Sequence, residues 1–334
     1  MIPATTPLQL RMPREYQPDE PDGVAAGEVV ARSSFNSSRL APHMPRASTS
    51  TGVELEYEAF GDDGAPAMVL VMGFAQQMIA WDPAFCRMLA ARGFRVVRFD
   101  NRDVGKSTHL AHAGVPDFFR AMQGERAAAP YGIEDMADDV DALIVALGVP
   151  AAHLVGVSMG GFIVQETAIR HPGRVLSLAS IMSSTGNRAV GHSSPEALAM
   201  IFAPAPTDRD ALVEHAVAIG RVIGSPRYRD DARSRVRSGE AWDRDHDAPG
   251  VARQAVAIVT QRNRTEDLGK LRVPTVVVHG EVDPLIAPSG GEATAEAVPG
   301  ARYVLVPDMG HDLPEALWPV LVDAIVDNAR RAGA

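Results

Sequence analysis

Ser158 stands at the centre of the pentapeptide Gly156-Val157-Ser158-Met159-Gly160, which has the pattern Gly-x-Ser-x-Gly. The apolar run HLVGV before the serine predicts a strand, and the run GGFIVQETAI after it predicts a helix. A chain that turns sharply from strand to helix leaves little room beside the serine, which accounts for the glycines. The spacing therefore predicts a nucleophilic serine that is exposed at the top of a sheet, at the positive end of a helix.

A serine hydroxyl needs a base to take its proton, and His311 is the histidine best placed to do so. It stands on the loop PDMGH, after the apolar run ARYVLVP and before the last helical segment. Asp283 follows the apolar run PTVVVHG, so we expect it at the same edge of the sheet, in the order Ser, Asp, His. Glu281 and Asp312 compete with it, but Glu281 is nearer the strand end and Asp312 is too close in sequence to reach across the ring. We therefore expect Asp283 to orient His311.

Acyl transfer through a serine also needs hydrogen-bond donors for the negative oxygen of the intermediate. We expect one donor to be the backbone N–H of Met159, the residue that follows the serine. The other is expected to be the N–H of Phe74, on the loop after the apolar run AMVLVMG, where Gly73 permits the turn. Trp81 lies further along the same loop, and we expect it to line an apolar substrate pocket.

Two further motifs resemble ligand sites but fit other roles better. Gly105-Lys106-Ser107 resembles the end of a phosphate-binding loop, yet Asp100 stands where that loop requires a glycine. Asp100, Arg102 and Gly105 are instead expected to hold a tight loop after a strand. The segment WDRDHD (242–247) suggests a metal site, but its mixed charges are more typical of a solvated face. We expect neither a metal nor an organic cofactor.

The composition of the chain narrows the classes of protein to which it can belong. Its 334 residues, 46% hydrophobic and 22% charged, are typical of a globular protein with a large core. A formal net charge of -10 disfavours a nucleic-acid partner. Cys86 is the single cysteine, which excludes an internal disulfide and a thiolate zinc site. Because no stretch is typical of a signal peptide or a membrane helix, the sequence predicts a cytoplasmic protein without a membrane partner, and it leaves the oligomeric state open.

Strand and helix patterns alternate along most of the chain. Apolar runs typical of strands occur at 53–60, 67–73, 94–100, 153–158, 174–184, 274–280 and 301–307. Helical spacing occurs at 83–93, 133–148, 160–172 and 314–331. This alternation predicts an α/β fold with a mostly parallel central sheet and helices on both faces, because parallel neighbours need crossover connections.

The strand patterns are interrupted once, over residues 185–249, where the chain becomes helix-like and charged. An insertion of this size predicts a helical cap over the carboxyl edge of the sheet. We therefore expect the core at 48–184 and 250–334. Residues 1–47 are rich in Pro, Ser and Arg, and we expect them to form a largely irregular extension.

With these motifs in order, the chain resembles the α/β-hydrolase superfamily over about residues 50 to 332. The resemblance rests on the segments VMGF, RFDNRDVGKS, GVSMGG, HGEVDPL and MGHDLP, which occur in the family's order. Within the superfamily, the longer segments VMGFAQQMIAWDPAFCRMLAARGFRVVRFDNRDVGKST and VPTVVVHGEVDPLIAP resemble the group that includes aclacinomycin methylesterase.

The resemblance implies a serine hydrolase that uses Ser158, Asp283 and His311 to cleave a carboxylic ester of a small apolar or polyketide-like molecule through an acyl-enzyme. The same triad could serve a cofactor-independent perhydrolase, lactonase, carbon–carbon hydrolase or acyltransferase. Haloalkane dehalogenases and epoxide hydrolases are disfavoured, because those relatives place Asp where Ser158 stands. A ligand-binding protein without turnover is the alternative from another class.

Overall fold

One eight-stranded sheet forms the centre of the molecule in the computed structural model, which describes residues 44–333. Residues 1–43, most of the predicted extension, and residue 334 lie outside the described part. The strand order is β1-β2-β4-β3-β5-β6-β7-β8. The strands are β1 (Arg46–Ser48), β2 (Glu54–Phe60), β3 (Ala67–Val71), β4 (Arg95–Phe99), β5 (Ala152–Val157), β6 (Val175–Ile181), β7 (Thr275–Gly280) and β8 (Arg302–Val306).

The sheet is parallel from β4 to β8, and only the pairs β1–β2 and β2–β4 are antiparallel. This confirms the predicted mostly parallel sheet. In the register, Val71 pairs with Gly156, Val157 with Ile181, and Gly280 with Val306. The carboxyl ends of β3, β5, β7 and β8 therefore lie along one edge of the sheet, where the loops that carry the candidate residues begin.

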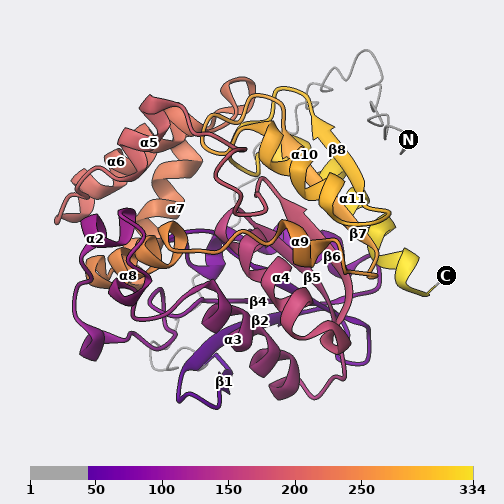
Figure 1. Ribbon diagram of the computed structural model, residues 1–334. Helices are drawn as coiled ribbons and strands as arrows, with labels where there is room; N and C mark the ends of the chain where they lie inside the picture. Colours follow the sequence, from indigo (N-terminus) through magenta and orange to yellow (C-terminus); the bar gives the residue numbers. More distant parts are fainter. Residues whose placement is uncertain (1–43, 334) are drawn as a thin grey trace, which may run out of the picture.

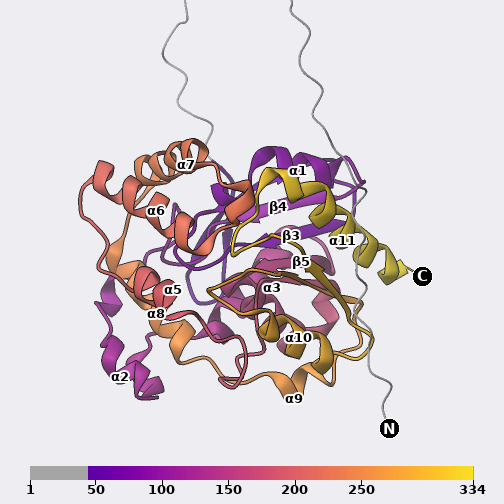
Figure 2. The ribbon, with the colours of Figure 1, turned by 90° about the horizontal axis from the view of Figure 1, so that it is seen from above.

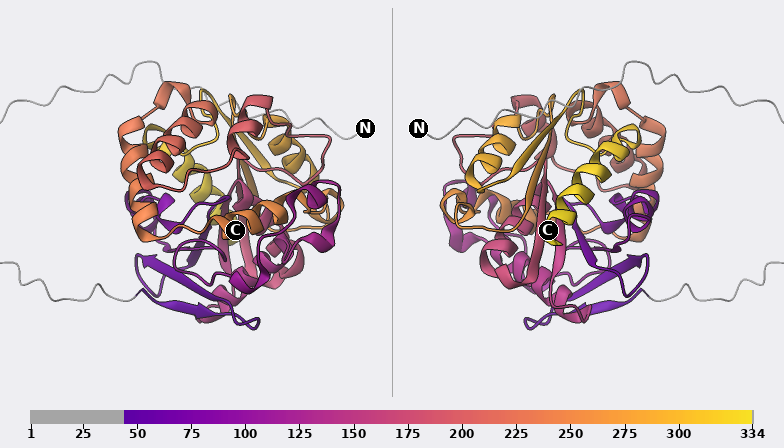
Figure 3. Two further views of the ribbon diagram at one scale, coloured as in Figure 1. Left: turned by 90° about the vertical axis from the view of Figure 1, so that its left-hand side faces the viewer. Right: turned by 90° about the vertical axis from the view of Figure 1, so that its right-hand side faces the viewer.

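Helices lie on both faces of the sheet, as predicted (Figures 1 and 3). The view from above in Figure 2 shows α1 and α11 on one face, and α3 and α10 on the other. Each face packs its own cluster of buried aliphatic and aromatic side chains against the strands. The helices are α1 (Pro83–Ala90), α2 (Phe118–Met122), α3 (Ile133–Ala146), α4 (Met159–Arg170), α5 (Pro195–Ile201), α6 (Arg209–Ile223), α7 (Asp231–Arg244), α8 (Ala248–Val259), α9 (Thr265–Leu268), α10 (Pro288–Ala297) and α11 (Trp318–Arg330).

Helices α5 to α8 follow β6 and precede β7, and we call them the cap. In Figure 1 they lie together at one end of the molecule, with α2 from the loop after β4 beside α8. The predicted boundary between residues 249 and 250 falls inside α8. Gly250 and Arg253 in this helix are buried, so α8 joins the cap to the core rather than ending the cap.

Two smaller features complete the fold. Arg46–Ser48 form the short edge strand β1, although the sequence predicted an irregular segment up to residue 47. Only Ala47 of the three is buried, and three residues are too few to show an alternation of apolar and polar side chains in the sequence. Cys86, on α1, is buried in the core. Among the described helices, none combines the length and the apolar character that crossing a bilayer requires.

Candidate active site

Ser158 sits at the turn between β5 and α4 in a strained backbone conformation, with φ 56° and ψ -118°. Positive φ is rare for a residue with a side chain and is held only when the surroundings determine it. A Cβ on Gly156 would lie 2.1 Å from the carbonyl oxygen of Gly160, and one on Gly160 would lie 2.1 Å from that of Val71. The turn therefore closes only with glycine at both positions, and the serine is half-buried at its apex.

A chain of hydrogen bonds joins the three residues predicted to form the triad. His311 Nδ1 lies 2.7 Å from Asp283 Oδ2, and His311 Nε2 lies 2.9 Å from Ser158 Oγ. An ionised carboxylate only accepts, so Nδ1 carries a proton and donates it to Asp283. In a neutral imidazole Nε2 then accepts from the serine hydroxyl, which is the arrangement that general-base catalysis requires.

Asp283 is surrounded by donors. Its Oδ1 accepts from the backbone N–H groups of Leu285 and Ile286 at 2.9 and 3.0 Å. Its Oδ2 faces His311, and His279 Nε2 lies 3.5 Å away. Burial alone would raise the pKa of Asp283, but the charge of His311 and the hydrogen bonds from both histidines lower it well below its usual range. The carboxylate is therefore ionised throughout the pH range in which histidine titrates.

The two competing carboxylates lie elsewhere. Glu281 is exposed to solvent. Asp312 Oδ1 instead accepts from the hydroxyl and the backbone N–H of Ser225, at 2.5 and 3.0 Å. Ser225 belongs to the cap, follows α6 and is almost fully buried; its Oγ also accepts from Gly310 N–H at 2.8 Å. Sequence reasoning missed Ser225, because a single serine between two helical segments carries no catalytic signal.

Two backbone N–H groups, of Phe74 and Met159, are expected to form an oxyanion hole. Among the described residues, neither Phe74 N–H nor Met159 N–H donates to another protein group. A Cβ on Gly73 would lie 3.2 Å from Ser158 Cβ, so the loop that carries Phe74 runs against Ser158. Met159 is the first residue of α4, where an N–H has no partner within the helix.

Trp81, expected to line the substrate pocket, has no exposed surface in this structure. Its ring stacks on Phe85 with centroids 5.6 Å apart, and Phe85 in turn contacts Trp318. The contacts seen for Trp81 are thus those of a core residue that supports α1 and α11.

The loop after β4 is held as its motif predicted. Asp100 accepts from Met78 N–H at 2.7 Å and from Lys106 N–H at 2.9 Å. Gly105 has φ 63°, and a Cβ there would collide with the Asp100 carboxylate. Arg102 pairs with the buried Asp139 through two hydrogen bonds of 2.6 and 2.7 Å. The loop after β4 therefore connects Met78, in the segment that follows Phe74, with Asp139 on α3.

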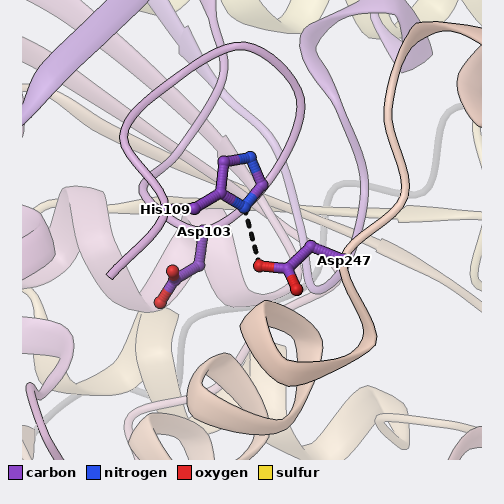
Figure 4. Close-up of side chains that lie close together, drawn as sticks. All are labelled: Asp103, His109 and Asp247. Carbon is purple, nitrogen blue, oxygen red and sulfur yellow. Dashed lines mark hydrogen bonds and ion pairs between the residues drawn. The ribbon is translucent and has the colours of Figure 1, made fainter. Parts of the chain in front are cut away.

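Asp103, His109 and Asp247 bring carboxylate and imidazole atoms within 4.8 Å of one another, a spacing that could suit a metal ion (Figure 4). However, Arg253 donates to both oxygens of Asp103 at 2.8 and 2.7 Å, and it contacts Asp247 at 3.3 Å. A metal ion would have to displace this arginine. Asp247 belongs to the segment WDRDHD, so that segment contacts the core and does not form only a solvated face as predicted.

Comparison with known proteins identifies the fold family of this chain. The family model described as the alpha/beta hydrolase fold matches residues 66–315. The chain belongs to the α/β-hydrolase fold family. Rhodomycin D methylesterase DauP of Streptomyces sp. (strain C5) is 28% identical to it over 310 residues, which span 86% of this chain and 98% of the relative. Rhodomycin D methylesterase DnrP of Streptomyces peucetius matches with the same identity and the same coverage.

Among solved structures, the enol-lactonase from Burkholderia xenovorans LB400 is 26% identical, with a TM-score of 0.65, over 86% of this chain and 100% of that one. The similarity to methylesterases extends over almost their full length. It supports ester hydrolysis by a serine hydrolase.

Proposed function

We propose that this protein hydrolyses a carboxylic ester through an acyl-enzyme, with Ser158 as the nucleophile, His311 as the base and Asp283 as the group that orients His311. The observation that carries the proposal is the unbroken hydrogen-bond chain from Asp283 through His311 to Ser158. The strained backbone of Ser158 adds support, because strain of this kind gathers at functional sites.

In the first half of the reaction, His311 Nε2 takes the proton of Ser158 Oγ as the oxygen attacks the ester carbonyl carbon. The carbonyl oxygen becomes negative and is bound by the N–H groups of Phe74 and Met159. His311 then gives its proton to the departing alcohol, which leaves the acyl group on Ser158. In the second half, water loses a proton to His311 as it attacks the acyl carbon. The bond between this carbon and Ser158 Oγ then breaks, His311 returns the proton to Oγ, and the acid is released.

The proposed substrate is an ester of a small apolar or polyketide-like molecule. This finer assignment is supported by the two relatives named as rhodomycin D methylesterases. A screen of short-chain p-nitrophenyl esters comes first, and rhodomycin D is then the first methyl ester to test.

A labelled fluorophosphonate separates an enzyme from a binding protein of the same fold. We expect stoichiometric labelling of the wild-type chain at Ser158, and none in Ser158→Ala. Ester hydrolysis should disappear in the same variant. A folded wild-type protein that neither reacts with the probe nor hydrolyses any ester would contradict the proposal.

A lactone is the second candidate substrate, because the enol-lactonase is similar in sequence and in structure over most of this chain. The chemistry is the same, except that the leaving alcohol stays attached to the acyl group. Comparing kcat/KM for an enol-lactone and for a methyl ester, with Ser158→Ala as the blank, decides between them.

A further inference from the structure

Gln254 is a glutamine of cap helix α8 with no exposed surface. Its Oε1 accepts from Ala75 N–H at 2.9 Å, and its Nε2 donates to the carbonyl oxygen of Arg102 at 2.8 Å. One partner can only donate and the other can only accept, so the orientation of the amide follows from its surroundings. Both ends of a buried amide are satisfied here, which is what burial of such a group requires.

Ala75 directly follows Phe74, whose N–H we assign to the oxyanion hole. Its φ is 58°, a conformation that costs free energy for a residue with a side chain and that neighbouring contacts must hold. Gln254 supplies such a contact from the cap. On the core side, Asn101 Nδ2 donates to Met72 O at 3.0 Å. The loop 72–75 is therefore held from two sides.

The position of this loop matters because it lies against the nucleophile. Gly73 approaches Ser158 so closely that a Cβ there would be 3.2 Å from the serine Cβ. The hydrogen bond to Ala75 N–H fixes the peptide unit next to the one that carries Phe74 N–H. A donor to an oxyanion must lie about 3 Å from the developing charge, and a shift of about 1 Å can cost about a hundredfold in rate.

We infer that Gln254 is a positioning residue for the oxyanion hole: it holds Ala75 N–H so that Phe74 N–H points at the reacting carbonyl oxygen. The inference rests on the proposed function, since it concerns the oxyanion hole of that reaction. It makes α8 of the cap a part of the catalytic scaffold, through hydrogen bonds of Gln254 to Ala75 and Arg102 rather than to the triad.

The test replaces Gln254 by Met in the full chain, which keeps the size of the side chain and removes both hydrogen bonds. We expect kcat to fall by roughly 10- to 100-fold while KM changes by less than about threefold. The Ki of a trifluoromethyl ketone, whose adduct with the serine places an oxyanion in the hole, should rise by the same factor as kcat/KM falls.

Gln165→Met is the matched control. Gln165, on α4, is also fully buried, donates to Ser180 on β6 at 3.0 Å and accepts from Arg264, just before α9, at 3.2 Å. Neither partner lies on the loop 72–75 or on the loop of His311. It should lose stability as Gln254→Met does, with the Ki of the ketone unchanged. If both variants show the same Ki, or if Gln254→Met keeps the wild-type Ki, the inference is wrong.

Gln254→Glu provides a second measurement that also serves if Gln254→Met does not fold. A protonated carboxyl can accept from Ala75 N–H and donate to Arg102 O as the amide does, whereas an ionised one cannot donate. Because burial favours the neutral carboxyl, we expect near wild-type kcat at low pH and an extra loss as pH rises, absent from the wild type. A pH profile parallel to that of the wild type would overturn the inference. Failure of the proposed function would show differently, as a wild-type chain without ester turnover.

Discussion

At the scale of single residues, the candidate site depends on Asp283 more than on any other charge. The carboxylate accepts two backbone N–H bonds through one oxygen and faces two histidines with the other. A fixed anion of this kind selects the His311 tautomer that can receive the serine proton, and it stabilises the imidazolium that then forms.

Asp283→Asn should therefore lower kcat by roughly 10³- to 10⁴-fold with little change in KM, because the amide can donate to His311 and favour the wrong tautomer. Initial rates on a p-nitrophenyl ester measure the effect. Glu281→Gln is the control, since that carboxylate is exposed, and it should keep wild-type rates. Equal losses in the two variants would show that Asp283 is not the orienting acid.

At the scale of elements, the cap contacts the loop of His311 as well as the loop 72–75. Ser225, just after α6, binds Gly310 and Asp312 on either side of His311. His311 N–H donates to Ile223 O at 2.7 Å, at the end of the same helix. This end of the cap and the histidine loop therefore form one unit.

Ser225→Ala removes a hydroxyl that both accepts and donates in this unit. We expect a loss of about 1–3 kcal/mol in the free energy of unfolding, because buried polar partners are left unsatisfied. We also expect a roughly tenfold lower kcat, because the histidine loop is less well held. Ser234→Ala, at a serine of α7 whose hydroxyl has no hydrogen-bond partner among the described residues, is the control for both measurements. A stable variant with wild-type kcat would show that Ser225 does not hold the loop.

A second contact between the cap and the core should contribute a stabilisation that depends on pH. His109 Nδ1 lies 2.7 Å from Asp247 Oδ2, and its Nε2 lies 3.1 Å from Gly105 O, with Asp245, Asp103 and Arg253 also near. The Asp247 carboxylate and the Gly105 carbonyl oxygen can only accept hydrogen bonds. Both bonds therefore form only when His109 is an imidazolium, because both of its ring nitrogens then donate. Burial would lower the pKa of His109, but the hydrogen bonds that it donates to Gly105 O and Asp247, together with the charges of Asp245 and Asp247, outweigh burial and raise the pKa.

Because the folded-state pKa is raised, the stabilisation is complete below the unfolded pKa of about 6.5 and is lost as pH rises through the folded value. His109→Gln should thus be less stable than the wild type at pH 6, and the difference should shrink by pH 9. Urea unfolding at the two pH values measures it. His112→Gln, at an exposed histidine nearby, should show no such trend. A gap that stays constant with pH would rule out the ionised form.

At the scale of the whole molecule, core and cap are expected to unfold together. The buried ion pair of Asp103 and Arg253 joins the loop after β4 to α8, and neither side chain has exposed surface. Asp103→Ala leaves the buried arginine with only its longer contact to Asp247, which should cost up to about 3–5 kcal/mol. Asp243→Ala, which breaks an exposed pair with Arg209 on the cap, should leave the unfolding midpoint unchanged.

Tryptophan fluorescence and far-UV circular dichroism should report one coincident unfolding transition of core and cap in the wild-type chain. Two separate transitions would contradict the expectation that core and cap unfold together.

Most of the fold could be predicted from the sequence, because buried parallel strands appear in it as continuous apolar runs. All seven predicted strands are present, and the loops that follow β3, β5, β7 and β8 bring the candidate residues to one edge. β1 could not be predicted, since only one of its three residues is buried. Gln254 could not either, because Ala75 lies 179 positions away and only the folded chain joins them.

The buried Cys86 has a practical consequence for labelling. It is the sole thiol of the chain, and burial raises its pKa to about 12. At neutral pH it is therefore a protonated, enclosed thiol that maleimides cannot reach. A cysteine introduced at Val236, a position on α7 that is 61% exposed, would be the only reactive thiol of the folded protein. A single fluorophore could then report whether the cap moves during turnover, with every native residue other than Val236 left in place.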